Sequence, residues 1–116
     1  MKTASCKAKG RRLQNMVAAM IREKFSLPEE DVRPVPMSSE GADIQLSNRA
    51  RLIFPFAVEC KNQERLNIWE AIKQAKKHGD NTCLTPLVVF TRNREDVYVS
   101  LPLEDFMDLL VICAAD

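Results

Sequence analysis

The sequence predicts a single α/β domain in which helices flank a mixed β-sheet. Two kinds of pattern follow one another along the chain: apolar residues at helical spacing, and short apolar or alternating runs that are typical of strands. Their order is helix, β-hairpin, helix, two strands and helix, which favours a sheet with helices packed on it. The 116 residues are 46% hydrophobic, enough for one domain with its own core, and the chain has no internal repeat or domain boundary.

The N-terminal half is expected to begin with a helix at Gly10–Phe25, after a loose basic arm over residues 1–9. Apolar residues of this helix recur at helical spacing and form one stripe: Leu13, Met16, Val17, Met20 and Ile21. Two prolines restrict Asp31–Pro36 to an irregular edge strand. A turn at Ser38–Gly41 then leads to a short strand at Ala42–Leu46.

A strand at Phe54–Asn62, reached through a basic hairpin connection at Ser47–Leu52, is predicted to be the centre of the sheet. Its side chains alternate between two faces. One face is apolar and suits the core: Phe54, Phe56, Val58 and Cys60. The other face holds Ala57, Glu59 and Lys61. Because an unpaired buried charge is costly, charges on so apolar a strand need a reason, and a divalent metal with a phosphate would supply one.

The C-terminal half predicts a helix, two strands and a last helix. The first of these helices spans Asn67–His78, with Asn67 as its N-cap and Gly79 as the residue that ends it. Its buried stripe is formed by Ile68, Ala71, Ile72 and Ala75. The apolar run Pro86–Thr91 predicts a buried strand, and Asp96–Leu101 alternates like a half-exposed strand. The last helix, Leu103–Ala114, is apolar on more than one face.

Two classes of protein are disfavoured by composition. No run approaches the ~18 apolar residues of a membrane span, and the N-terminus lacks the apolar segment of a signal peptide, so we expect a cytoplasmic protein with no membrane partner. The four cysteines form no CxxC pair and the chain has one histidine. This argues against a zinc site and favours reduced thiols.

Charge is distributed unevenly, although the net charge is only +1. All 17 Lys and Arg lie within residues 1–94, together with 10 acidic residues, whereas residues 95–116 hold 6 acidic residues and no base. The basic part could follow a phosphate backbone while the acidic end faces away from it. A solvated surface of mixed charge is the alternative.

Asp43, Glu59 and Lys61 form the spaced motif Asp–x15–Glu–x–Lys, and Gln74 follows in the next helix. With their neighbours they resemble the PD-(D/E)xK nuclease superfamily, and most closely its archaeal and phage Holliday-junction resolvases. The matching pieces are KGRRLQ (Lys9–Gln14), SSEGAD (Ser38–Asp43), ECKN (Glu59–Asn62) and NIWEAIKQA (Asn67–Ala75). They keep the expected order of hairpin strand, strand end and helix, and span nearly the whole domain.

The resemblance implies a restriction-endonuclease-like fold and a metal-dependent DNA endonuclease of phage or prokaryotic type. It implies that Asp43, Glu59 and the backbone carbonyl of Cys60 hold Mg²⁺, or Mn²⁺ in its place, because Mg²⁺ prefers hard oxygen ligands. Lys61 would orient the attacking water or the phosphate and stabilise developing charge. Gln74 would hydrogen-bond Lys61 or the water. The substrate would be a four-way DNA junction and the enzyme a homodimer, since paired nicks require two sites on one particle.

One position departs from the resolvase pattern. The first helix of those enzymes usually carries a Glu that joins the metal site, and the matching position here is Gln14. Glu40 is the candidate for the missing carboxylate, and Ser38 or Ser39 for a contact with the scissile phosphate.

Several basic residues near these motifs are candidates for contact with the DNA backbone. They are Lys9, Arg11, Arg12, Arg49 and Arg51. Arg49 and Arg51 are equally compatible with simple loop charges.

Residue chemistry alone leaves alternatives for each assignment. Glu59 and Lys61 could be an ordinary edge-strand ion pair, and Gln74 a surface residue of its helix. Trp69 is expected in the core or an interface rather than against a base, and His78 is expected to favour the helix dipole. The apolar last helix favours a dimer interface over a place between the sheet and a loop. The protein could also be a nuclease of other branched, nicked or duplex DNA, or a non-catalytic DNA-binding subunit with this fold.

Overall fold

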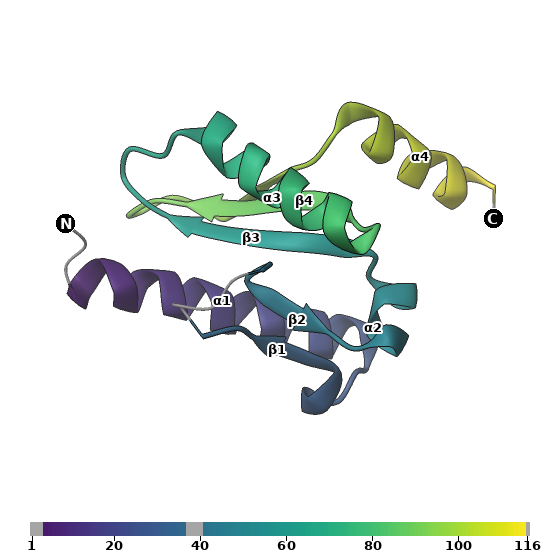
Figure 1. Cartoon of the computed structure of the whole chain (residues 1–116), viewed down its shortest axis with the longest axis horizontal. Coiled ribbons are helices and arrows are strands. Elements are labelled where there is room, and N and C mark those ends of the chain that lie inside the picture. Colours follow the sequence, from purple (N-terminus) through teal and green to yellow (C-terminus); the bar gives the residue numbers. More distant parts are fainter. Residues whose placement is uncertain (1–3, 37–40, 116) are drawn as a thin grey trace.

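The computed structural model describes residues 4–36 and 41–115 and confirms a mixed α/β fold with helices on a mixed sheet (Figure 1). In chain order, the elements are α1 (Ala4–Phe25), η1 (Glu29–Asp31), β1 (Val32–Pro34), β2 (Ile44–Leu46), α2 (Asn48–Ile53), β3 (Phe56–Asn62), α3 (Ile68–Thr82), β4 (Thr85–Thr91), β5 (Tyr98–Ser100) and α4 (Leu103–Ala114).

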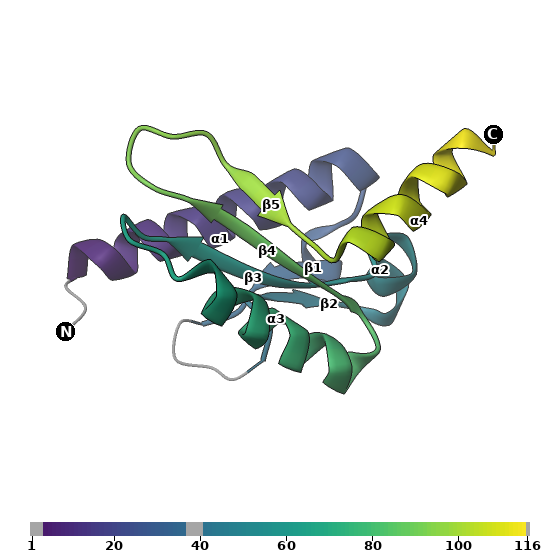
Figure 2. The same ribbon diagram turned by 90° about the horizontal axis from the view of Figure 1, so that it is seen from above.

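The main sheet has the order β3-β4-β5, with β3 parallel to β4 and β5 antiparallel to β4. Helix α3 makes the crossover that a parallel pair of consecutive strands requires. Strands β1 and β2 form a separate antiparallel pair. The backbone N–H of Asp43, just before β2, donates to the carbonyl of Val58 at 2.8 Å. This bond joins the hairpin to the edge of β3 (Figure 2).

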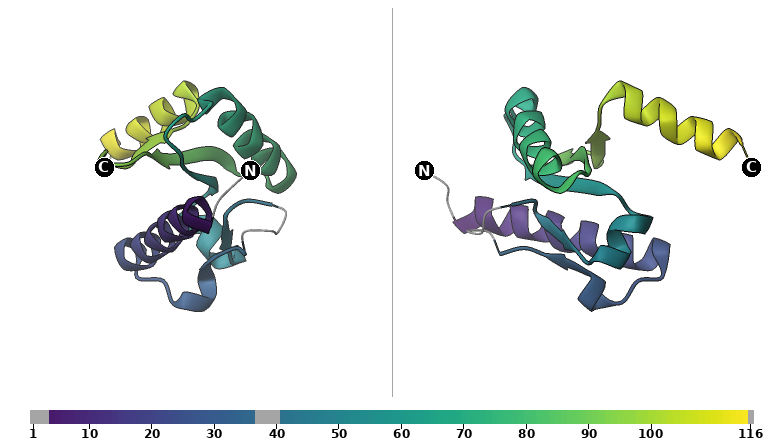
Figure 3. Two further views of the ribbon diagram at one scale, coloured as in Figure 1. Left: turned by 90° about the vertical axis from the view of Figure 1, so that its left-hand side faces the viewer. Right: turned by 45° about the vertical axis from the view of Figure 1, so that its right-hand side comes forward.

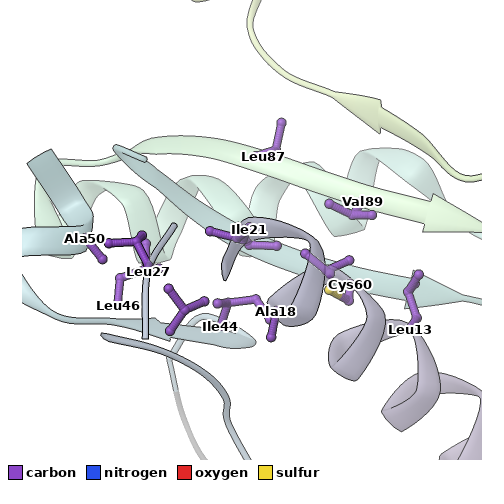
Figure 4. Close-up of a cluster of buried hydrophobic side chains, with 13 residues drawn as sticks. Leu13, Ala18, Ile21, Leu27, Ile44, Leu46, Ala50, Cys60, Leu87 and Val89 are labelled. Atoms are coloured by element: carbon purple, nitrogen blue, oxygen red, sulfur yellow. The ribbon is translucent and has the colours of Figure 1, made fainter. Parts of the chain in front are cut away.

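Helix α1 covers one face of the main sheet and α3 covers the other (Figure 3). The larger core lies on the α1 side, where Leu13, Ala18 and Ile21 of α1 meet Cys60 and Val89 of the sheet (Figure 4). The smaller core lies on the α3 side and contains Ala71, Ala75 and Val88. The predicted alternation of Phe54–Asn62 is therefore confirmed in β3, since its apolar face lies in the larger core. Its predicted place at the centre of the sheet is wrong, because β4 pairs with both β3 and β5 and leaves β3 at one end of the main sheet.

Three expectations for the N-terminal half are wrong. Helix α1 begins at Ala4, so residues 4–9 are helical rather than a loose arm. The expected hairpin connection at Ser47–Leu52 is the short helix α2, which Ser47 caps by accepting a 3.1 Å hydrogen bond from the N–H of Ala50. Met16 and Met20, predicted in the buried stripe, are 39% and 52% exposed. The expected turn at Ser38–Gly41 lies almost wholly outside the described residues.

Helix α3 starts as predicted and ends later than predicted. The side chain of Asn67 caps it by accepting a 3.2 Å hydrogen bond from the N–H of Glu70. Gly79 does not end the helix, which continues to Thr82 and ends at Cys83 with a positive φ of 58°. Gly79 is needed for close packing instead, because a Cβ there would lie 2.5 Å from the carbonyl oxygen of Leu84.

Helix α4 has the predicted bounds but no buried residue, and it projects from the end of β5 (Figures 1 and 2). The alternative that the last helix lies between the sheet and a loop is therefore wrong. Within residues 4–36 and 41–115, no helix is both long enough and apolar enough to cross a membrane. All four cysteines fall in these ranges and form no disulfide.

Candidate active site

Asp43 is held against the edge of β3 by its backbone and its side chain. Its N–H donates to the carbonyl of Val58 at 2.8 Å, and its own carbonyl accepts from the N–H of Val35 at 2.8 Å. Its carboxylate oxygen Oδ2 accepts a 2.6 Å hydrogen bond from the N–H of Cys60. Since the N–H and C=O of a strand residue point to the same edge, the carbonyl of Cys60 faces the side on which Asp43 lies.

Glu59 and Lys61 lie on the α3 side of the same strand, as the alternation predicted. The ammonium Nζ of Lys61 is 3.7 Å from Glu59 Oε2. Glu59 is buried, with 7% of its surface exposed, and the side chain of Lys61 is 18% exposed. The alternative interpretation, an ordinary ion pair on the surface of an edge strand, would leave both side chains much more exposed than they are.

The electrostatics of this site favour a bound cation. Burial raises the pKa of Glu59 to about 7; the negative charge of Asp43 adds to this rise and Lys61 opposes it. Glu59 Oε1 is buried and accepts no hydrogen bond from the described residues. Two close carboxylates, one with an unsatisfied buried oxygen, would both be stabilised in their charged forms by a divalent cation.

Cys60 contributes no thiolate to the site. Burial, and then the charges of Asp43 and Glu59, raise the pKa of its thiol far above the ordinary range, so the thiol stays protonated at neutral pH. Its side chain points into the larger core, in agreement with the sequence prediction. If Cys60 takes part in metal binding, it does so through its backbone oxygen, a hard ligand of the kind Mg²⁺ prefers.

His78 is the residue of the site that sequence reasoning missed. Its Nε2 atom is 3.9 Å from Glu59 Oε1, and its side chain is 21% exposed. The expectation that His78 marks the helix C-terminus fails because α3 continues to Thr82. Gln74, the candidate from α3, is exposed, and no hydrogen bond joins it to Lys61 among the described residues. The sequence did offer a signal for His78: it lies four residues after Gln74, so both are on one face of the helix.

The third acidic ligand is not found among the described residues. Ser38, Ser39 and Glu40 lie outside them. Gln14 is buried in α1 with 5% of its surface exposed, among residues of the larger core. Residues 4–36 and 41–115 contain no group of three or more His, Cys, Asp and Glu side chains that could hold a metal.

Asp43 and Glu59 nevertheless fit a magnesium ion, because Mg²⁺ is usually bound by one or two carboxylates and keeps several waters. Such an ion polarises a phosphoryl oxygen and makes a nucleophile from water.

The five basic candidates have different surroundings. Arg11 and Arg12 are exposed on α1. Lys9 is 3.7 Å from Glu64, and Arg49 is 3.7 Å from Asp31 through its NH1 atom, so each has an acidic partner. Arg51 lines a cavity of about 340 Å³ together with His78 and Asn81, and its Nε is buried without a hydrogen bond from the described residues.

Trp69 is 76% exposed at the start of α3, so the expectation that it lies in the core is wrong. A role in an interface or against a base stays a prediction.

Residues 5–111 match the model of the family described as "Phage putative PDDEXK endonuclease". No curated protein matches the chain, and no solved structure does. The matched range includes Asp43, Glu59 and Lys61, which the fold brings together at β3. The chain therefore belongs to the phage-type PD-(D/E)xK endonuclease family.

Proposed function

We propose that this protein is a magnesium-dependent, structure-selective DNA endonuclease that resolves four-way junctions by hydrolysing phosphodiester bonds. The proposal rests on one observation: Asp43, Glu59 and Lys61 come together at β3. Asp43 accepts a hydrogen bond from the strand backbone, and Lys61 lies beside Glu59. Family membership supports the nuclease class. The proposal that the substrate is a four-way junction rests on the sequence resemblance to Holliday-junction resolvases.

Each residue has a role that its position supports. Asp43 and Glu59, with the carbonyl of Cys60, would hold Mg²⁺ (or Mn²⁺) at the edge of β3. The ion would stabilise charge on the phosphoryl oxygens. Lys61 would orient the attacking water or the phosphate and stabilise the charge that develops. His78 would hold the second oxygen of Glu59, which has no hydrogen bond from the described residues.

The DNA backbone would follow the basic residues of the N-terminal part. Arg11 and Arg12 are exposed on α1, while Arg51 lies at the cavity that also contains His78. Lys9 and Arg49 would exchange their acidic partners for phosphates. Contacts of this kind fix the position of a duplex without reading its sequence.

A homodimer is the form that this activity requires, and α4 is the surface we propose for it. Seven large apolar residues of α4 are between 38% and 73% exposed: Leu103, Phe106, Met107, Leu109, Leu110, Val111 and Ile112. Their exposed apolar area is roughly several hundred Å², the size of the largest apolar patches on soluble monomers, which often mark an interaction site. Since each partner buries ~800 Å² in a stable interface, α4 would form a large part of such an interface. A two-fold contact would hold two sites at a fixed distance, as paired nicking needs.

Cleavage of labelled DNA separates this proposal from its alternatives. The protein is incubated in Mg²⁺ with an end-labelled four-way junction, a nicked or flapped duplex, and a linear duplex of the same sequence. Symmetric nicks in the junction alone support the resolvase. Preferential cleavage of the nicked or flapped DNA would support a related nuclease, and binding without cleavage of any substrate would support a non-catalytic DNA-binding subunit.

A further inference from the structure

A second cavity, of about 540 Å³, lies at the other end of α3 from the cavity that contains His78. It opens where β3 and β4 end and α3 begins. Its walls include Arg65, Leu66, Phe90, Arg92, Asp96 and Tyr98. None of these residues belongs to the candidate metal site, so the cavity has no role in the function described so far.

Two residues that line this cavity, Phe90 and Tyr98, are in register with Lys61 across the sheet. In the sheet, Lys61 is paired with Phe90 and Phe90 is paired with Tyr98. Paired residues on neighbouring strands point to the same face, so the three side chains form one row on the α3 side. Neighbouring strands are about 4.8 Å apart, which places Tyr98 on the order of 10 Å from Lys61. The rings of Phe90 and Tyr98 are 6.3 Å apart between centroids, with 33° between their planes.

The chemistry of the lining suits a flat, uncharged ring. Tyr98 is 57% exposed, so much of its ring is accessible, while Phe90 is partly buried against the smaller core. Arg65 and Arg92 supply two positive charges to the lining. Three carboxylates also line the cavity: Glu64, Glu95 and Asp96. A lining of mixed charge has no cluster of bases for a phosphate, whereas a nucleobase offers a π-face to the rings and amino groups to the acids.

The carboxylates also have partners that keep them in place. Glu64 accepts a 2.7 Å hydrogen bond from the N–H of Asn93. Glu95 is 3.3 Å from Arg92. The bond between Glu64 and Asn93 ties the turn after β4 to the segment after β3, and the pair of Arg92 and Glu95 lies within that turn.

We infer that this cavity receives an unstacked DNA base adjacent to the scissile phosphate, with the base lying against Tyr98 and Phe90. The inference rests on the proposed function and deepens it by naming what the enzyme recognises at a branch point. A base inside a continuous duplex must be unstacked and unpaired before it can enter, whereas a base at a branch or nick gives up less on leaving its stack. Selection of branched over linear DNA would then follow from the cavity itself.

Binding and fluorescence measurements without cleavage test this inference. A four-way junction carries 2-aminopurine at one of the nucleotides flanking the branch point, and Ca²⁺ replaces Mg²⁺ in the buffer. The wild type is compared with Tyr98→Ala, with Tyr98→Phe, which keeps the ring, and with Val99→Ala. Val99 is the matched control: it is the next residue of β5, is 55% exposed, and pairs with Val89 of the opposite core. Circular dichroism checks that each variant is folded.

We expect Tyr98→Ala to lower the preference for junction over linear duplex by about fivefold or more, as loss of one base–aromatic stack would. Tyr98→Phe and Val99→Ala should keep that preference. The 2-aminopurine emission of the bound junction should differ between wild type and Tyr98→Ala, and should be unchanged in Val99→Ala.

Equal effects of Tyr98→Ala and Val99→Ala would overturn the inference. So would a loss of dimer mass in Tyr98→Ala with unchanged 2-aminopurine emission, because the cavity would then receive a protein side chain. A wild type that gives the Tyr98-dependent emission change but cuts no DNA in Mg²⁺ would support the base site and contradict the endonuclease proposal. The two proposals therefore fail separately.

Discussion

His78 Nε2 lies 3.9 Å from Glu59 Oε1, between α3 and β3. That oxygen is buried and accepts no hydrogen bond from the described residues. The imidazole is thus placed to hold the Glu59 carboxylate in one orientation, as groups behind a metal ligand do in metal sites.

His78→Ala should therefore weaken metal binding more than it weakens the fold. We expect the Mg²⁺ concentration for half-maximal cleavage to rise about 10-fold or more, and Mn²⁺ binding measured by calorimetry without DNA to weaken in parallel. His78→Gln, which keeps a hydrogen-bonding side chain, should recover part of the loss. The matched comparison is Gln74→Ala, four residues earlier on α3 and exposed. If Gln74→Ala weakened metal binding more than His78→Ala did, Gln74 would be the α3 residue of the site, as the sequence predicted.

The raised pKa of Glu59 makes stability depend on pH when no metal is bound. Between its ordinary pKa of 4.5 and its folded value of about 7, the folded protein binds more protons than the unfolded chain. With respect to this group, the free energy of unfolding should therefore be highest below pH 4.5 and should fall as pH rises through 7, by on the order of 3 kcal/mol.

Urea unfolding at several pH values, with a chelator present, measures this dependence. Asp43, Lys61 and His78 also face Glu59, so the wild type is compared with Glu59→Gln, which removes only the Glu59 carboxylate. The variant should show a flatter profile between pH 5 and 8. Parallel profiles would mean that Glu59 titrates normally in the folded protein.

Arg11 and Arg12 are predicted to contact phosphates. Replacing both with Ala should reduce the slope of log K against log[salt] by about 0.9 for each lost contact, with no change in sequence preference. Lys24→Ala, at the exposed C-terminal end of the same helix, is the control for the loss of one charge. If the double variant keeps the wild-type slope, this face of α1 does not contact DNA.

The α4 surface is predicted to form the dimer. Light scattering at micromolar concentration should give a dimer mass for the wild type and a monomer mass for Leu110→Asp combined with Val111→Asp, because two charges would be buried without partners. Leu52→Asp is the control, since Leu52 is 86% exposed on α2 and is also a large apolar residue. A monomer mass for the wild type that persists with junction DNA would contradict both the dimer and the resolvase.

The elements that the sequence predicted well are those whose signals are local. The alternation of β3, the Asn67 cap and the bounds of α4 follow from side-chain period and capping chemistry within a few residues. The end of α3 could not be predicted in this way. Gly79 is a common helix terminator, but here its missing side chain allows the helix to pass close to Leu84, a contact that only the folded chain contains.

The candidate site, too, could be predicted only where its residues are linked by local spacing. Asp43, Glu59 and Lys61 could be grouped from spacing and strand alternation, and the structure brings Asp43 to the backbone of Cys60 as well. His78 shares a helix face with Gln74, but its approach to Glu59 depends on how α3 packs against β3, which helical spacing alone does not show. The cavity lined by Phe90 and Tyr98 was missed for a similar reason: its rings come from β4 and β5, whose register is set by tertiary pairing.

The most direct test of the site compares Mg²⁺-dependent cleavage of a labelled four-way junction by the wild type, Asp43→Asn and Glu59→Gln. We expect symmetric nicks from the wild type and no cleavage from either variant. Junction binding by the variants should stay equal or become tighter, because each change removes a negative charge near a phosphate. Near-normal Mg²⁺-dependent cleavage by either variant would show that the active site lies elsewhere.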